Sequence, residues 1–128
     1  MKVAVIGCTH AGTAAILNLK RIYPDSDVTV FERNDNISFL SCGIALYVGG
    51  VVKDAQGLFY CSPDKLKELN VDTKMRHNVE SADIKGKKII AKNLETGVET
   101  EHAFDKLIIT SGSWPIIPRI EGIDSNNI

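Results

Sequence analysis

The order of elements expected in residues 3–32 constrains the fold more than any other feature of the sequence. Residues 3–6 form a short apolar run rich in β-branched side chains, which is typical of a strand covered on both faces. A glycine turn at residues 7–12 leads into a helix that the apolar spacing predicts over residues 11–22, before Pro24. A second strand is predicted at residues 28–31. Strand, turn, helix and strand in this order form the right-handed crossover of a parallel sheet, so we predict an α/β fold.

The rest of the chain adds loops, an antiparallel excursion and one more strand to this unit. Residues 34–70 are expected to be loop and short helices, one of them beginning at Pro63 with Ser62 as its cap. Residues 73–103 alternate and contain turn signals, which predicts an antiparallel excursion, and residues 107–109 return to the main sheet. From Trp114 onward the sequence is typical of a linker. We therefore expect one domain over residues 1–113 and a linker over residues 114–128.

Composition excludes several classes of protein. With 44% hydrophobic and 24% charged residues, 128 residues suit one soluble domain. A net charge of -1 with mixed signs offers no basic face for nucleic acid or a membrane surface. No apolar run approaches the roughly 18 to 20 residues of a membrane span, so we expect a cytoplasmic protein. The three cysteines, Cys8, Cys42 and Cys61, are widely separated and predict neither a disulfide framework nor a metal site.

The turn GCTHAG has the first and last glycines of a dinucleotide-binding fingerprint, Gly7 and Gly12, with Thr9 in place of the middle glycine. Glu32 follows at the end of the next strand, where a carboxylate binds a ribose in such folds. The free amide groups at the helix start suit a pyrophosphate, although the extra Cβ of Thr9 is expected to weaken affinity modestly. A structural turn in an α/β protein without a nucleotide is the alternative. His10, beside this turn, is a candidate site residue, although a lone histidine is more often solvated.

Cys42 precedes a helix expected over residues 43–48, where amide groups and the helix dipole favour a thiolate. A buried, unreactive cysteine is the default interpretation of such a residue. Flavin disulfide reductases have a second cysteine five residues after the first, and this chain has Tyr47 there.

Several motifs occur together along the chain: GCTHAGTAAILNL, FERN, SFLSCGIALYVGG, LFYCSPDKL and DKLIITSGSWPIIP. In this order and spacing the sequence resembles the bacterial NADH oxidase and NADH peroxidase family. SFLSCGIALYVGG is most similar to water-forming NADH oxidases, and coenzyme A disulfide reductases share the single cysteine. The resemblance implies a Rossmann-like FAD-binding domain, FAD as cofactor, NADH as substrate, dioxygen or peroxide as its partner, and a homo-oligomeric parent protein.

The resemblance also assigns residues. Cys42 would be the redox cysteine, alternating between thiolate and sulfenic acid, with His10 nearby. The FAD-binding residues would be Gly7, Thr9, His10, Ala11 and Gly12 at the pyrophosphate, Glu32 and Arg33 at the adenosine ribose, Val79 at the adenine through its backbone, Cys42 at the flavin, and Thr110, Ser111, Gly112 and Ser113 in a second flavin segment. Cys8 and Cys61 match no functional position, so we expect them to be packing residues.

A complete member of the family is expected to add an NADH-binding domain, a return segment that completes the FAD domain, and a dimerisation domain. We therefore expect an FAD-binding domain that is incomplete at its C-terminus and no oxidase activity from these 128 residues alone. NADH peroxidase and coenzyme A disulfide reductase are the alternative activities. A nucleotide-binding module without catalysis is the alternative from another class.

Overall fold

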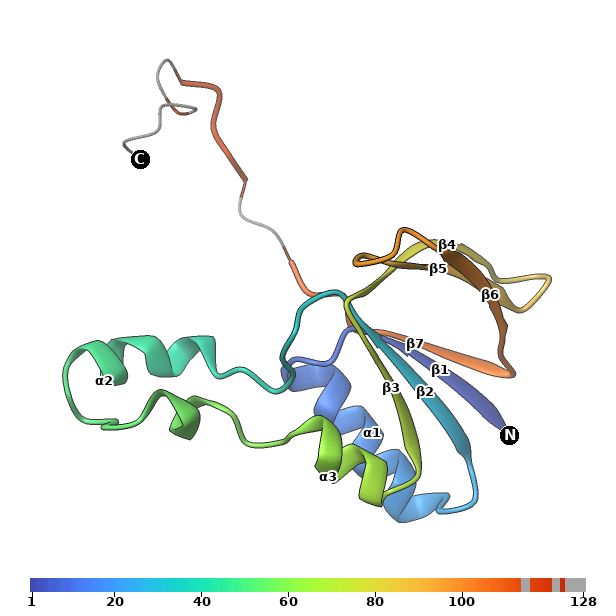
Figure 1. The fold of residues 1–128 in the computed structure, drawn as a ribbon, viewed down its shortest axis with the longest axis horizontal. Coiled ribbons are helices and arrows are strands. Elements are labelled where there is room, and N and C mark those ends of the chain that lie inside the picture. Colours follow the sequence, from blue (N-terminus) through green and yellow to red (C-terminus); the bar gives the residue numbers. More distant parts are fainter. Residues whose placement is uncertain (114–115, 121–122, 124–128) are drawn as a thin grey trace.

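The computed structural model describes residues 1–113, 116–120 and 123. Its centre is a four-stranded parallel sheet in the order β3-β2-β1-β7 (Figure 1). The strands are β1 (Lys2–Ile6), β2 (Asp27–Glu32), β3 (Val71–Met75) and β7 (Lys106–Ile109). The predicted α/β fold with a parallel central sheet is confirmed.

Two helices cover one face of the sheet (Figure 1). Helix α1 spans His10–Ile22, one residue longer at its start than predicted, and α3 spans Pro63–Glu68. Ser62 caps α3 as expected, because its Oγ accepts a hydrogen bond from the backbone N–H of Lys65 at 3.2 Å. The core on this face consists of apolar side chains from the sheet, both helices and the loop after β2: Val3, Val5, Cys8, Ile16, Val28, Val30, Ile37, Leu66 and Val71.

A three-stranded antiparallel sheet covers the other face. It is formed by β4 (His77–Asp83), β5 (Lys88–Asn93) and β6 (Glu99–Ala103) in sequence order. A second core cluster, with Phe31, Ile89 and Phe104 as its largest members, lies between the two sheets. The antiparallel excursion is therefore present as expected, and its burial of Phe31 helps to fix the end of β2.

The predicted start of the excursion at residue 73 is wrong, because residues 71–75 form the parallel edge strand β3. Parallel strands are usually apolar on both faces. Here Asp72 and Lys74 stand on a partly open edge and form an ion pair with Nζ and Oδ2 3.0 Å apart. This alternation of polar and apolar residues resembles that of an antiparallel strand, which is why the sequence predicted the wrong start.

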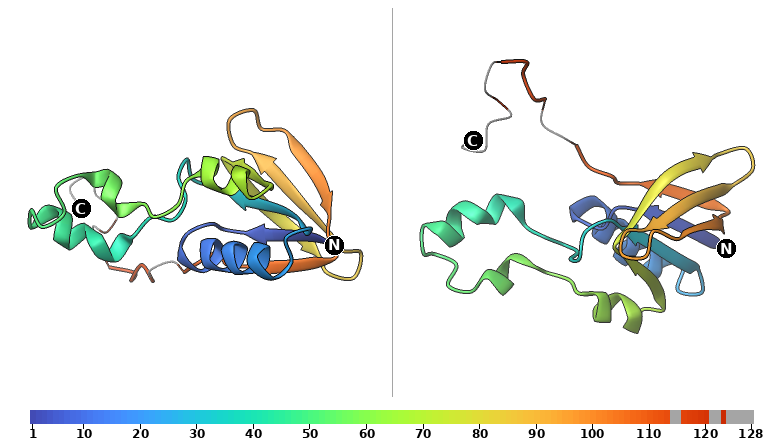
Figure 2. Two further views of the ribbon diagram at one scale, coloured as in Figure 1. Left: turned by 90° about the horizontal axis from the view of Figure 1, so that it is seen from below. Right: turned by 45° about the horizontal axis from the view of Figure 1, so that its top comes forward.

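Residues 40–60 project away from the sheet in each view of Figures 1 and 2. This projecting segment contains a 3-10 turn (Ser41–Gly43), helix α2 (Ile44–Val48) and a second 3-10 turn (Ala55–Leu58). At its base, Phe39 and Phe59 form an isolated antiparallel bridge and their ring centroids are 5.4 Å apart. Loops and short helices were expected here, and α2 buries none of its residues.

No helix in the described part of the chain is long and apolar enough to cross a membrane. The predicted linker begins at Trp114, and its residues 114–115, 121–122 and 124–128 lie outside the described residues. The boundary between domain and linker stays a prediction.

The end of α1 is held by a buried lysine. Lys20 is only 8% exposed, and its Nζ donates hydrogen bonds to the carbonyl oxygens of Pro24 at 2.7 Å and Ser26 at 2.9 Å. These oxygens belong to the turn between α1 and β2, so the ammonium group fixes the crossover.

Replacing Lys20 by methionine keeps most of the side-chain length and removes both hydrogen bonds. The free energy of unfolding should fall by about 1–3 kcal/mol, because the two carbonyls lose a charged donor. Urea denaturation measures the change. Lys85→Met, at an exposed position in the turn after β4, is the control and should change stability by less than about 0.5 kcal/mol. Equal stabilities of the two variants would contradict this role of Lys20.

Candidate functional site

The glycine turn lies where β1, α1 and β7 meet. Gly7 has a φ of +88°, and a Cβ there would overlap the Thr110 carbonyl oxygen. A Cβ at Gly12 would overlap the Gly7 carbonyl oxygen. The Thr110 hydroxyl donates to the carbonyl oxygens of Ile6 and Gly7 at 2.8 and 2.9 Å. Both glycines are therefore required by close backbone packing, as the sequence indicated.

The first turn of α1 has free backbone donors. Its N-cap, Thr9, makes no side-chain capping hydrogen bond, and the first turn contains no acidic residue. Thr9, His10 and Ala11 are exposed at this end. The helix start thus offers N–H groups and the positive end of its dipole to an anion.

Glu32 ends β2 beside the turn and is only 2% exposed. Its Oε2 accepts a hydrogen bond from the backbone N–H of Cys8 at 2.7 Å. Its Oε1 accepts two from Asn34, one from the backbone at 2.9 Å and one from the side chain at 2.7 Å. A carboxylate has about four acceptor positions, so one position on Oε2 stays available for a hydroxyl group.

A cleft of about 220 Å³ lies along the carboxyl ends of the parallel strands. It brings together eight of the predicted binding residues: Gly7, Thr9, Glu32, Arg33, Val79, Thr110, Ser111 and Gly112. His10, Ala11, Gly12, Cys42 and Ser113 do not line it. Sites for drug-sized ligands are about 300–1,000 Å³, so this cleft has room for only part of a dinucleotide.

Five further residues line the cleft that were not predicted: Ile6, Phe31, Asn34, His77 and Asn78. Asn34 follows Glu32 by two positions, and its contacts with that carboxylate depend on the turn of the chain after β2. His77 and Asn78 open β4, directly before Val79. The sequence did offer a signal for these two residues, because two polar side chains directly precede Val79, which was predicted to contact the adenine.

Cys42 is exposed and lies in the 3-10 turn before α2. The helix expected over residues 43–48 is observed as the five-residue α2, which follows Cys42 as expected. The default of a buried cysteine does not apply here. Tyr47 in α2 is 42% exposed, and no disulfide is present among the described residues.

His10 is stacked on an aromatic residue of the projecting segment. The rings of His10 and Tyr60 have centroids 5.7 Å apart and an interplanar angle of 17°. The Tyr60 hydroxyl also donates to the His10 carbonyl oxygen at 3.4 Å. The sequence did not predict Tyr60 as a partner, because the two residues are 50 positions apart.

The other two cysteines pack in the core on the helix side. Cys8 is fully buried in it, and Cys61 packs against it with partial exposure. Burial raises the pKa of the Cys8 thiol to about 11, and it also raises the pKa of the Cys61 thiol. Both features agree with the packing role expected for these residues.

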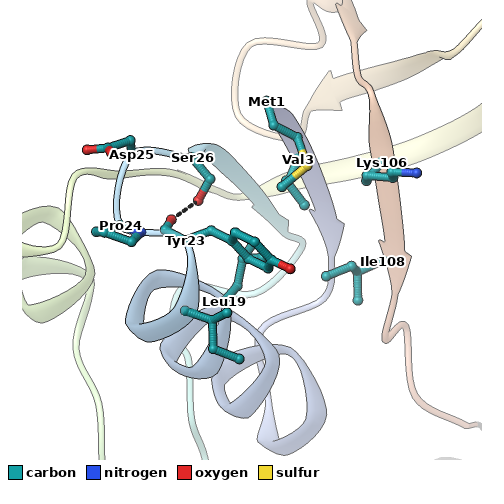
Figure 3. A pocket seen from close by; sticks show the side chains of 10 residues that line it. Met1, Val3, Leu19, Tyr23, Pro24, Asp25, Ser26, Lys106 and Ile108 are labelled. Atoms are coloured by element: carbon teal, nitrogen blue, oxygen red, sulfur yellow. Dashed lines mark hydrogen bonds between the residues drawn. The ribbon is translucent and has the colours of Figure 1, made fainter.

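A larger cavity, of about 680 Å³, lies elsewhere. It is an apolar hollow between the end of α1 and the strands β1 and β7, with Leu19, Tyr23 and Ile108 in its lining (Figure 3). Met1 and Val3 place it at the amino end of β1, whereas the glycine turn follows the carboxyl end. No predicted site residue lines it. Among the described residues there is also no group of three or more side chains that could hold a metal ion.

The buried thiol of Cys8 predicts a loss of stability in alkaline solution. The unfolded thiol ionises near pH 9 and the folded one near pH 11. The folded state therefore keeps a proton that the unfolded state has lost, and stability falls as pH rises between these values. The decrease in the free energy of unfolding should reach about 2–3 kcal/mol.

Urea denaturation from pH 8 to pH 11 measures this slope, and Cys8→Val is the matched control because it keeps an apolar side chain of similar size. The difference between the two proteins in the slope of unfolding free energy against pH gives the contribution of Cys8, because lysines and tyrosines that ionise in the same range contribute equally to both. Identical slopes would exclude the contribution of this thiol.

Comparisons with known proteins agree with the fold. The sequence profile of the pyridine nucleotide-disulphide oxidoreductases matches residues 1–128. A NADH oxidase of Enterococcus faecalis is 59% identical over the whole chain, which spans 29% of that protein. The water-forming NADH oxidase of Lactobacillus brevis, solved with NADH bound, has a TM-score of 0.94 and 56% identity over 98% of this chain and 28% of its own.

A more distant group of relatives shares the fold and part of the sequence. A coenzyme A disulfide reductase of Staphylococcus haemolyticus is 28% identical over 88% of this chain, which covers 26% of that protein. A reduced Bacillus anthracis protein described as CoADR-RHD has a TM-score of 0.89 and 32% identity over 95% of this chain and 22% of its own. Because the family profile matches every residue, this chain belongs to the pyridine nucleotide-disulphide oxidoreductase family.

Proposed function

We propose that this chain forms the ADP-binding part of an FAD site in a flavoprotein NADH oxidase that reduces dioxygen to water. The observation that carries the proposal is the uncapped start of α1, which lies beside a cleft lined by Glu32 and residues 110–112. The similarity to NADH oxidases over the whole chain supports the same activity. The chain spans 29% of the Enterococcus relative, so the reaction itself is assigned to the complete protein.

The residues present fit FAD. The amide groups at the start of α1 would hold the pyrophosphate, helped by the absence of an acidic residue in that turn. The available position on Glu32 Oε2 would accept a ribose hydroxyl, and Val79 would lie against the adenine. Gly112, with a φ of +77° and no heavy atom within 4 Å of an added Cβ, would let the chain after β7 pass close to the cofactor.

When bound, FAD would accept hydride from NADH and pass the electrons to dioxygen. Cys42 would then act on the resulting peroxide. Its thiolate would attack one peroxide oxygen, forming an S–O bond while the O–O bond breaks and hydroxide leaves. The hydride equivalent of a second NADH would supply two electrons and one proton, and with one further proton from solvent it would return the sulfenic acid to the thiol and release water. His10, stacked on Tyr60, would be the neighbouring ring in this site.

A single redox cysteine supports this cycle, because a second thiol nearby would convert the sulfenic acid into a disulfide. Tyr47 occupies the position of a resolving cysteine, and Cys8 is buried. The same proposal includes a cytoplasmic enzyme that assembles as a homo-oligomer.

Coenzyme A disulfide reductase is the second candidate activity, favoured by the similarity to the Staphylococcus and Bacillus proteins. An exposed single cysteine such as Cys42 also suits a mixed disulfide with coenzyme A. Lower identity places it behind the oxidase. NADH peroxidase activity, which shares the cysteine chemistry, is a further alternative.

The nucleotide site predicts opposite effects of one substitution on stability and binding. In Thr9→Asp, the new carboxylate caps α1 and should raise the free energy of unfolding by about 0.5–2 kcal/mol. The same charge faces the phosphates and should weaken ADP binding at least tenfold. NMR titration of the 128-residue chain with ADP measures affinity even in the millimolar range.

Thr9→Asn is the matched control, because asparagine caps the helix equally well without a charge. Its side chain occupies an amide group of the helix start but adds no charge, so it should bind ADP more tightly than Thr9→Asp and more weakly than the unchanged chain. Failure of ADP to shift the amide signals of residues 7–12 would refute the proposed site. Equal affinities of the Asp and Asn variants for ADP would show that the phosphates do not bind at the start of α1.

The role of Cys42 predicts a change of product in the complete protein. Cys42→Ser removes the thiolate that intercepts peroxide, so hydrogen peroxide should replace water as the main product of NADH oxidation. A peroxide assay run beside oxygen consumption measures the ratio. Cys61→Ser, at a partly exposed cysteine outside the proposed site, is the control and should leave water as the product. Unchanged water formation in Cys42→Ser would reject the redox role.

A further inference from the structure

Tyr60 is an aromatic residue beside the start of α1 to which the proposed function gives no role of its own. It is the last residue of the projecting segment, is 46% exposed and belongs to neither core cluster. Its neighbour Phe59 forms the isolated bridge with Phe39. Packing in a core therefore does not account for the Tyr60 ring, and its contacts lie at the surface where the projecting segment meets α1.

Two contacts join Tyr60 to His10, the first residue of α1. The two rings are stacked, with centroids 5.7 Å apart and an interplanar angle of 17°. Aromatic rings favour offset stacking at centroid separations of about 4.5–7 Å. The Tyr60 hydroxyl also donates to the His10 carbonyl oxygen at 3.4 Å. One contact involves the histidine side chain and the other its backbone, so together they restrict both the ring and the helix start.

The two limbs of the projecting segment are paired next to Tyr60. The outgoing limb leads to Cys42, and the returning limb ends at Tyr60. The N–H of Leu40, in the outgoing limb, donates to the carbonyl oxygen of Leu58, in the returning limb, at 2.8 Å. The position of Tyr60 is thus coupled to the start of the turn that contains Cys42.

Ser38 anchors the chain on the domain side of these limbs. It is fully buried, and its N–H donates to the carbonyl oxygen of Cys8 at 2.8 Å. Its Oγ donates to the carbonyl oxygen of Cys61 at 2.7 Å and accepts from the N–H of Cys61 at 2.8 Å. The stacking of Tyr60 on His10 adds a second anchor one residue further out, and this anchor involves a proposed site residue.

We propose that Tyr60 is a positioning residue for the reaction of Cys42, and that it acts by holding the His10 ring beside the limb that carries this cysteine. The inference rests on the proposed function and names a residue that the proposed reaction needs. Without the stacked ring, an exposed histidine at a helix start can adopt several rotamers. Groups that hold reacting partners in one geometry raise the rate of the step between them. Loss of the Tyr60 ring should therefore let peroxide escape before Cys42 reacts with it.

NMR of the 128-residue chain at constant pH tests the contact without cofactor or substrate. The ring current of a stacked Tyr60 displaces the signals of the His10 ring protons, so Tyr60→Leu should move these signals toward those of an unstacked histidine. Tyr60→Phe keeps the ring and should leave them near their original positions. Tyr23→Leu is the matched control and should leave them unchanged, because Tyr23 is 56% exposed and lies at the other end of α1.

Product analysis of the complete protein tests the role in the reaction. Tyr60→Leu should raise the ratio of hydrogen peroxide to water by about two- to tenfold, the change expected from the loss of one aromatic pair. KM for NADH should stay the same, because the change concerns the step at Cys42. A residue that only stabilises the fold would not change the product ratio. Tyr60→Phe should return the ratio to that of the unchanged protein.

His10 signals that do not move in Tyr60→Leu would overturn the inference, because the two rings would then not be stacked in solution. An unchanged product ratio in Tyr60→Leu, together with peroxide release by Cys42→Ser, would also overturn it and leave the proposed function intact. Unchanged water formation in Cys42→Ser would refute the redox role of Cys42 and the inference with it.

Discussion

The buried carboxylate of Glu32 connects the glycine turn to the loop after β2, and the geometry of the candidate site depends on this connection. One oxygen holds the backbone of the glycine turn through Cys8, and the other holds the loop after β2 through Asn34. A buried charge is costly unless it is hydrogen-bonded, and here three donors compensate it. The position of the carboxylate depends in turn on β2, which is fixed between the helix-side core and the antiparallel sheet that covers Phe31. The turn, the strand end and the loop consequently form one rigid edge of the cleft.

The parts of the fold that could be predicted from sequence are those whose cause is local. The apolar run before Gly7, the helix spacing after it and the position of Glu32 each follow from short-range chemistry, and the structure has all three. Strand β3 was assigned wrongly because its sequence reflects its place at the sheet edge. Asp72 and Lys74 are tolerated there because only one side of the strand is paired.

The candidate site divides in the same way. Gly7, Gly12 and Glu32 have conformational or hydrogen-bonding requirements that leave a mark on the sequence. Asn34 was missed because its contacts with Glu32 depend on the turn of the chain after β2. His77 and Tyr60 were missed because their neighbours in space come from other elements. His10 and Tyr60, for example, meet only through the path of the projecting segment. The catalytic roles of Cys42 and His10 stay predictions, because the structure gives the positions and contacts of these residues and does not test their chemistry.

The projecting segment is expected to unfold locally more easily than the rest of the domain. Its helix α2 buries no residue and Val48 is 80% exposed. The contacts described at its base include the bridge between Phe39 and Phe59 and the stacking of Tyr60 on His10. Regions with few buried contacts unfold locally at a small free-energy cost, while central strands such as β1 open only with the whole domain. Cys42 therefore lies in a region of low local stability, and the glycine turn lies in a region of high local stability. Amide hydrogens around Cys42 will exchange with solvent long before those of β1.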